Sequence, residues 1–469
     1  KYYRARSHLL GDIVNSEAAY VKRALFNYAD SGYTLFKSGT ASRRAMTYVG
    51  ANDGMLHAFD ATTGDEVWAY IPSMVLPNLY KLADTAYKDN HQAYVDGSPN
   101  VADIYDGSAW KTILVAGLGA GGRGYYALDV TDPNSPKALW EFTDADLGLT
   151  FGNPIVTKLA NGTWVVVFAS GYNNNVSGGD GNGHLYVLNA NTGALMKNSA
   201  GVTLKIPTYT SGSTPAGTTT TPSGLAKINA WVDSPIDNTS KRFYGGDLLG
   251  NLWRFDVDGL VAPKTAALRL AQMQVSGTPQ PITTKPELAE ITANGATRAV
   301  VFVATGEYLG TTDLGNKALQ SVYGIEDHLS ATGLGDVRAG ATLVAQTLTE
   351  TLSSSKQKIR TVSSHAVDWS VKNGWMVDLP AAGERVNVDM LLQFNTLVVA
   401  SNIPNNDACN AGGESWLFQL GLGTGSNIST APDKAAAVWQ GAMTVGLGFV
   451  QLKTGPGSGS SGSSGTGAA

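Results

Sequence analysis

The sequence is poor in charged residues and in cysteine. Of its 469 residues only 15% are charged, while 55 are glycine and 18 are proline. This balance suits short strands joined by tight turns rather than long helices, so we expect an all-β fold. Cys409 is the single cysteine, which excludes an internal disulfide. We expect its thiol either to stay free or to pair with a partner outside this chain.

Long runs of one character are missing as well. No apolar run approaches the roughly 18 residues that a membrane helix needs, so we expect no membrane span. The net charge is −5 and no run of Lys and Arg stands out, so we expect no nucleic-acid partner. The chain begins with Lys1 and carries no signal peptide, and we interpret it as a fragment of a longer precursor.

A short pattern recurs along the chain. Its clearest copies lie at residues 48–64, 183–193 and 244–259, and looser copies lie at residues 124–132, 321–326 and 415–425. Each copy has an apolar strand, a turn rich in Gly, Asn or Asp, and an alternating strand that ends in an acidic or amide residue, often before a Thr-Gly turn. One such meander cannot bury both of its faces, but several arranged radially can. The repeat therefore predicts a modified β-propeller.

The residues that end the alternating strands set the expected number of blades. They are Asp60, Asp129, Asn189, Asp256, Glu326 and Gln419. Their spacing of roughly 60 to 90 residues exceeds the about 40–50 residues of a minimal blade, so we expect long inter-strand loops and short helical insertions. The wide gap before Gln419 holds two more strand-like segments, residues 341–348 and 374–379. We therefore predict a further blade there, and seven blades in all.

The remaining segments complete the expected domain organisation. Residues 1–30 form a lead-in that packs on the propeller, with a short helix at residues 17–27, and residues 31–452 form the propeller. Residues 453–469 are rich in Gly and Ser and form a flexible tail. The apolar spacing within residues 77–87 predicts a helix on an insertion between strands. Residues 443–452 are expected to form a strand that pairs with the N-terminal region and closes the ring.

Large aromatic residues of the repeats predict packing between blades. Trp68, Trp140, Trp253 and Trp416 lie in or beside repeat strands. Each indole buries a large area when it packs against a neighbouring sheet. An exposed sugar-binding platform is the alternative for these residues.

Signals for catalysis are weak. His57 and His184 lie in equivalent repeat strands and on the same strand face, which favours a packing role. No His-Glu-x-x-His or Gly-x-Ser-x-Gly segment occurs, which argues against a zinc protease and against a serine nucleophile of that type. The Gly-rich segment at residues 117–124 precedes a strand rather than a helix, so it is not expected to bind phosphate.

Five segments, taken in order, resemble the C-terminal domain of the PilC/PilY family: residues 6–16, 48–60, 116–133, 144–154 and 244–256. The resemblance extends over roughly residues 4–452. It implies the modified β-propeller of large secreted proteins associated with type IV pili, whose variable N-terminal part often carries adhesive modules. It also implies a non-enzymatic role at the pilus tip, which supports pilus assembly against retraction, surface adhesion and twitching motility.

The same resemblance suggests location and partners. We expect an extracellular or cell-surface position, reached by export through the periplasm and outer membrane. The expected partners are minor pilins or the pilus tip complex, the N-terminal module of the same protein, and a host or abiotic surface.

Members of this family often carry a calcium loop, Asp-x-Asn/Asp-x-Asp-x-x-x-Asp, just before a Tyr-x-Gly-Asp strand. Alignment on the strand that ends at Asp247 places Asp233 and Asp237 at two carboxylate positions. Pro235 falls at another ligand position, and Lys241 falls at the last. Because Ca²⁺ takes about 6–8 oxygen ligands, we predict a degenerate loop in which Lys241 replaces the ion by pairing with Asp233 or Asp237. Calcium is the one cofactor considered, and we expect none to bind well.

Two further hypotheses remain open. The polar segment at residues 173–182 is rich in side-chain oxygens, and we considered it as a metal site, although hairpin tips commonly have this composition. Residues 58–68 also resemble the tryptophan-docking repeat of PQQ-type quinoprotein dehydrogenases, in which Trp caps the junction between blades. Their quinone usually stacks on a disulfide of adjacent cysteines, which Cys409 alone cannot form, so we predict no enzyme activity.

Overall fold

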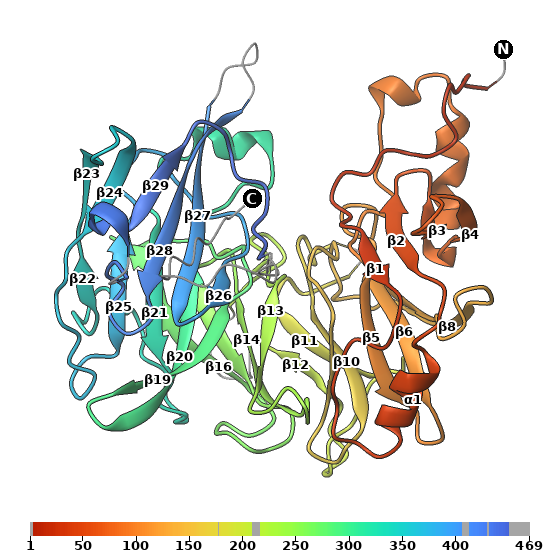
Figure 1. The fold of residues 1–469 in the computed structure, drawn as a ribbon, viewed down its shortest axis with the longest axis horizontal. Helices are drawn as coiled ribbons and strands as arrows, with labels where there is room; N and C mark the ends of the chain where they lie inside the picture. Colours follow the sequence, from red (N-terminus) through yellow and green to blue (C-terminus); the bar gives the residue numbers. More distant parts are fainter. Residues whose placement is uncertain (1–2, 177, 209–215, 406–411, 429–430, 450–469) are drawn as a thin grey trace, which may run out of the picture. The chain divides into compact units, whose positions relative to one another are not determined.

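The chain folds mainly as β-sheets (Figure 1). This computed structural model describes residues 3–176, 178–208, 216–405, 412–428 and 431–449. Cys409 and the Gly/Ser-rich tail therefore lie outside the described residues. The chain divides into two compact units, of which the first comprises residues 1–271 and 329–335 and the second residues 272–328 and 336–469.

The first unit contains four sheets, and each is a meander of four consecutive strands. The first sheet consists of β1 (Ala19–Val21), β2 (Met46–Ala51), β3 (Met55–Asp60) and β4 (Glu66–Tyr70). The second consists of β5 (Asn100–Tyr105), β6 (Trp110–Gly117), β7 (Tyr125–Asp129) and β8 (Lys137–Phe142). The third consists of β9 (Ile155–Lys158), β10 (Trp164–Ala169), β11 (His184–Asn189) and β12 (Lys205–Pro207). The fourth consists of β13 (Ile228–Val232), β14 (Ser240–Gly246), β15 (Asn251–Phe255) and β16 (Ala267–Gln272).

Helices in the first unit are short. The helix α1 (Tyr33–Gly39) lies between β1 and β2, and the 3₁₀ helices η1 (Ser73–Ala83) and η2 (Tyr87–Asp89) lie between β4 and β5. The predicted helical insertion around residues 77–87 is thus confirmed. The helix predicted for residues 17–27 is wrong, because β1 forms there and pairs with β2, with Ala19 opposite Tyr48. Among the described residues, no helix combines the length and the apolar character needed to cross a membrane.

The second unit contains a two-stranded ribbon and two larger sheets. The ribbon consists of β17 (Gln274–Val275) and β18 (Thr278–Pro279). The five-stranded sheet has, in spatial order, β19 (Glu287–Ala293), β20 (Ala296–Ala304), β21 (Ser321–Glu326), β25 (Gly374–Asp378) and β22 (Val344–Gln346). The six-stranded sheet has, in spatial order, β23 (Leu348–Leu352), β24 (Lys358–Val362), β29 (Ala437–Gln440), β28 (Gly413–Gly421), β27 (Thr396–Pro404) and β26 (Leu391–Gln393). The 3₁₀ helices of this unit are η3 (Thr311–Gly315) and η4 (Pro432–Lys434).

The separate blade predicted between Glu326 and Gln419 is wrong. Both predicted segments do form strands, but β25 pairs with β21 as the fourth strand of an existing sheet, and β22 adds to β25 in parallel. The described residues therefore form six sheets of four or more strands. Spacing along the chain does not distinguish a strand that starts a new sheet from one that completes the sheet before it.

The strand predicted for residues 443–452 is also wrong over its described part. Residues 443–449 form no strand. The backbone N–H of Thr444 donates instead to the side chain of Asn402, at 2.9 Å.

The residues predicted to end the repeat strands occupy equivalent places in the sheets. Asp60, Asp129, Asn189 and Glu326 are the last residues of β3, β7, β11 and β21, Asp256 directly follows β15, and Gln419 lies within β28. The side-chain oxygen of Asn189 accepts hydrogen bonds from the backbone N–H groups of Asn191 and Thr192, both at 3.0 Å. This local bonding reverses the chain, as the sequence pattern predicted.

Tryptophans on fourth strands dock on the turns of the next sheet. Trp68 of β4 donates its indole N–H to the carbonyl of Pro133 at 2.8 Å, and Trp140 of β8 donates to that of Ala190 at 2.9 Å. In the second unit, Trp375 of β25 donates to the carbonyl of Leu422 at 2.7 Å. The predicted packing between blades is confirmed for Trp68 and Trp140.

Trp253 and Trp416 also belong to apolar clusters that span neighbouring sheets. Their packing role is therefore confirmed too. The indole N–H of Trp253 is bonded differently, since it donates to Asp247 of its own sheet at 2.8 Å.

Docking of the Trp140 indole explains why the turn after Asn189 contains Gly193. Gly193 has φ +70°, and a Cβ at this position would lie 2.5 Å from Trp140. Gly64 has a similar φ of +80°, but a Cβ there would meet nothing within 4 Å. Gly193 is thus required both by its backbone conformation and by the indole beside it.

Replacement of these two glycines separates the two requirements. Both Gly64→Ala and Gly193→Ala place a side chain at positive φ, at a cost of about 1–2 kcal/mol. Gly193→Ala also overlaps Trp140, and overpacking of this kind costs about 1–3 kcal/mol more. We expect a lower urea midpoint for Gly193→Ala than for Gly64→Ala, and equal midpoints would contradict the docking role of Gly193.

Candidate functional site

The predicted calcium loop lies between β13 and β14. Asp233 and Asp237 are in this loop, and Lys241 is the second residue of β14. The Lys241 ammonium forms an ion pair with the Asp233 carboxylate. Its hydrogen bond lowers the pKa of Asp233 below the usual value. The predicted pairing of Lys241 with one of the two carboxylates is therefore confirmed for Asp233.

A second ammonium, which the sequence pattern did not reveal, faces the other carboxylate. Lys158 of β9 places its Nζ 3.2 Å from Asp237 Oδ1 and 2.7 Å from Asp30 Oδ1. The backbone N–H of Lys158 donates to the carbonyl of Asn238 at 3.0 Å, which holds β9 against the loop. Lys158 precedes Asp237 by 79 residues, so no local spacing could have identified it.

These residues do not fit a calcium ion. Pro235 offers no side-chain oxygen, and each of the two carboxylates is paired with an ammonium. Ca²⁺ requires about 6–8 oxygens around a site whose own charge is negative. Two positive charges at the ligand oxygens oppose a dication directly.

Calcium titration of designed variants tests this account of the loop. For the unaltered chain we expect no Ca²⁺ binding tighter than about 1 mM, the weak end of loop-type sites. The double variant Pro235→Asp, Lys241→Asp supplies two ligand positions and removes one ammonium, so it should bind Ca²⁺ in the range of about 10⁻⁴–10⁻³ M. The matched control, Pro235→Asp alone, keeps Lys241 and should not bind. Tight calorimetric binding by the unaltered chain would show that the account is wrong.

The two repeat histidines are both buried, and carboxylates lie beside both rings. His57 in β3 places Nδ1 2.7 Å from Glu66 Oε1, and Nε2 lies 3.1 Å from both oxygens of Asp53. Burial opposes a charge on His57, but the hydrogen bonds to Asp53 and Glu66 outweigh it and raise the pKa of the imidazole above its usual value. His57 is buried with its ring stacked on Phe59, which agrees with the predicted packing role, and its carboxylate partners add an electrostatic role.

Protonation of His57 should make stability depend on pH. A pKa that is higher in the folded than in the unfolded chain stabilises the fold below the unfolded value of about 6.5. That contribution is lost as the pH rises through the folded pKa. We expect the difference in urea midpoint between the unaltered chain and His57→Gln to be large near pH 5.5 and to shrink by about pH 8.5. A difference that grows with pH would contradict the protonated pair.

His184 has different surroundings. It begins β11 and lies beside Asp146 and Asp180, with Nε2 3.9 Å and 3.7 Å from one oxygen of each. Burial lowers the pKa of His184 below its usual value. Asp180 belongs to the polar segment of residues 173–182 that we considered as a metal site.

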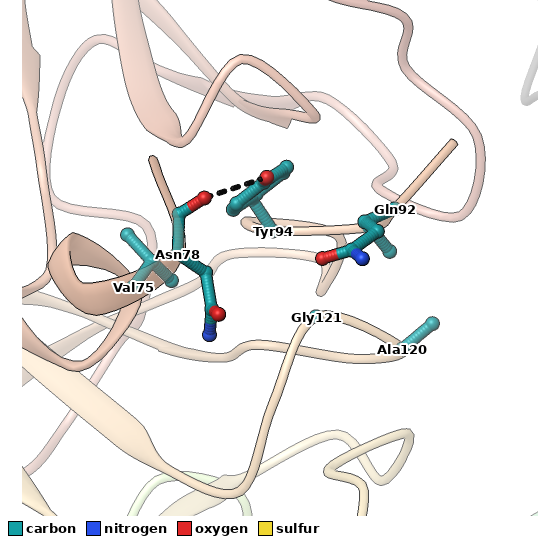
Figure 2. A pocket seen from close by; sticks show the side chains of 7 residues that line it. Val75, Asn78, Gln92, Tyr94, Ala120 and Gly121 are labelled. Carbon is teal, nitrogen blue, oxygen red and sulfur yellow. Dashed lines mark hydrogen bonds between the residues drawn. The ribbon is translucent and has the colours of Figure 1, made fainter. Parts of the chain in front are cut away.

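A pocket of about 280 Å³ lies between η1 and the Gly-rich segment before β7 (Figure 2). Its lining includes Asn78, Gln92, Tyr94, Ala120 and Gly121. The Tyr94 hydroxyl donates to the backbone carbonyl of Asn78 at 3.0 Å, as the dashed line in Figure 2 shows.

A model of a known protein family matches most of this chain. The family model described as the PilY1 beta-propeller domain matches residues 10–358. The predicted β-propeller and the resemblance to the PilC/PilY family are thereby confirmed.

Two relatives are similar over nearly the whole chain. A type IV pilus biogenesis factor PilY1 homolog of Xylella fastidiosa is 35% identical over 97% of this chain. The type IV pilus biogenesis factor PilY1 of Pseudomonas aeruginosa strain PAO1 is 33% identical over 91% of this chain. The chain spans only 34% and 39% of the lengths of these two proteins.

A solved structure supports the same fold. The crystal structure of the Pseudomonas aeruginosa PilY1 C-terminal domain is similar to this chain with a TM-score of 0.73 and 27% identity. The similarity covers 93% of this chain and 96% of that domain.

Proposed function

The chain belongs to the PilY1 family of type IV pilus biogenesis factors, and we propose that it acts in pilus assembly as a binding scaffold that performs no enzymatic turnover. The observation that carries this proposal is the identity of 33–35% to PilY1 proteins over 91% or more of the chain. By this proposal the chain works outside the cell, at the pilus tip, where it supports pilus extension, surface adhesion and twitching motility.

Several features of the fold suit such a scaffold. Indole–carbonyl contacts tie successive sheets together within each unit. Long connections leave these sheets, including the η1 insertion and the β10–β11 loop. Rigid sheets that present variable loops are a common way to build a binding surface. Minor pilins, or the N-terminal module of the same protein, are the partners that we propose for these loops.

Two other functions are distinguished by simple measurements. A direct adhesin would bind a host or abiotic surface through this domain without binding pilins. A PQQ-type dehydrogenase remains the enzymatic alternative, because tryptophan docking also occurs in those propellers. It would require the quinone to bind without the usual pair of adjacent cysteines.

A pull-down with purified minor pilins tests the proposal. We expect the immobilised chain to retain one or more minor pilins, and the retained pilin to be displaced by the free chain. In parallel, a chimeric Pseudomonas aeruginosa PilY1 that carries this chain in place of its own C-terminal domain should restore surface pili and twitching to a strain without PilY1.

Two controls accompany these assays. Binding to glass or host cells with no retention of pilins would favour the adhesin. Dye reduction with an alcohol, in the presence of added quinone and calcium, would refute the non-enzymatic proposal.

A further inference from the structure

A second group of side chains that can bind a metal lies in the first unit, on elements other than the Asp233 loop. Asp146 is in the loop that follows β8, Asp180 is in the loop between β10 and β11, and His184 begins β11. One donor atom from each of these residues lies within 4.8 Å of the others. Two separate loops and the start of a strand thus bring two carboxylates and one imidazole together.

A hydrogen bond fixes the orientation of the His184 imidazole and shows which of its nitrogens carries the proton. His184 Nδ1 lies 3.0 Å from the backbone carbonyl oxygen of Asn182. Because a carbonyl can only accept, Nδ1 carries the proton and donates it, and a neutral ring then has its lone pair on Nε2. The His184 side chain is only 6% exposed, and within the described chain Nε2 takes part in no hydrogen bond.

The lone pair faces two anionic groups. Nε2 is 3.7 Å from Asp180 Oδ2 and 3.9 Å from Asp146 Oδ2. A nitrogen lone pair that faces carboxylate oxygens without a donor between them is repelled by their negative charge. A cation placed between the three groups would relieve this repulsion, and a metal ion can supply it.

The local charge favours an ion with two positive charges. Asp144, Asp146 and Asp180 supply three carboxylates, and Lys205 of β12 supplies one ammonium. Lys205 Nζ lies 2.7 Å from both Asp144 Oδ1 and Asp146 Oδ2. With a neutral imidazole this group keeps two uncompensated negative charges, which a dication neutralises and a single proton does not.

We propose that Asp146, Asp180 and His184 bind Zn²⁺, or a divalent transition metal of the same class, with water as the fourth ligand. One imidazole nitrogen with carboxylate oxygens is a ligand set that Zn²⁺ accepts readily, whereas Ca²⁺ favours sites made of oxygen only. Donor atoms in a tetrahedral zinc site with bonds of about 2.0–2.2 Å lie about 3.3–3.6 Å apart. The distances from Nε2 to the two carboxylates exceed this range by a few tenths of an ångström, and the three donor atoms lie within 4.8 Å of one another, so binding of the ion requires the ligands to move closer together.

The surroundings of the three ligands support the site. The Asn182 carbonyl orients the imidazole, as the outer hydrogen-bonding partners of zinc ligands do. The backbone N–H of Asp180 donates to Asp146 Oδ1 at 2.8 Å, which holds the two ligand loops together. The Asp180 side chain is 46% exposed, so an ion can enter from solvent.

Occupation of the site would have a structural consequence. A metal bound to all three residues would tie the loop after β8 to the loop before β11, and these loops leave two successive sheets. Lys205 bonds to Asp146 Oδ2 and therefore competes with the ion for that oxygen.

Titration of the full chain with Zn²⁺ tests the proposal. We expect about one Zn²⁺ per chain in calorimetry, and a loss of affinity of at least about tenfold for both His184→Gln and Asp180→Asn. The matched control is His57→Gln, which replaces a buried histidine in an equivalent strand and should bind Zn²⁺ as the unaltered chain does. Lys205→Met should bind Zn²⁺ more tightly, because the competing ammonium is gone.

A second measurement distinguishes loss of the metal site from loss of the fold. Co²⁺ in place of Zn²⁺ should give the visible absorption of a tetrahedral site in the unaltered chain and in His57→Gln. The solvent-facing variant Asp180→Asn should lose that absorption while its circular dichroism stays unchanged. The proposal would be overturned if the unaltered chain took up no Zn²⁺, or if His184→Gln bound it as tightly as His57→Gln.

Discussion

The hydrogen bond from an indole on the fourth strand of one sheet to a carbonyl in the turn of the next is the contact on which the architecture depends. It joins Trp68 to Pro133 and Trp140 to Ala190 in the first unit, and Trp375 to Leu422 in the second. A four-stranded meander has two faces to cover and two exposed edges. Docking on the neighbouring sheet covers its faces. The contact also sets the sequence of the receiving turn, since only glycine fits beneath the indole at Gly193.

Corresponding strands in this scaffold carry different chemistry. His57 and His184 occupy corresponding strands, but His57 has a carboxylate at each ring nitrogen, whereas His184 donates to a backbone carbonyl and presents its second nitrogen to two carboxylates. The loop around Asp233 likewise departs from the calcium-loop pattern of the family. Lys241 and Lys158 are placed at the oxygens that a cation would otherwise bind. Corresponding parts of the scaffold thus carry different charges.

The sequence predicted those features that depend on local patterns. The ends of the repeat strands, the turns after Asp60 and Asn189, the helical insertion and the pairing of Lys241 with a loop carboxylate are all set within a few residues. Contacts between distant segments were missed. Lys158 reaches Asp237 across 79 residues, β25 joins β21 rather than a new sheet, and β1 forms where a helix was expected because β2 pairs with it. Of the group of Asp146, Asp180 and His184, only Asp180 belongs to the polar segment of residues 173–182 that the sequence indicated, and the other two residues lie outside it.

The docking of one sheet on the next is tested most directly by hydrogen–deuterium exchange of the Trp140→Phe variant. Phenylalanine fills most of the same volume but has no N–H to donate to Ala190. We predict faster exchange in the turn of residues 189–194, which belongs to the neighbouring sheet, with little change in β6 and β7 of the sheet that carries the substitution. Faster exchange confined to β8 and its own sheet, with the turn still protected, would contradict the account.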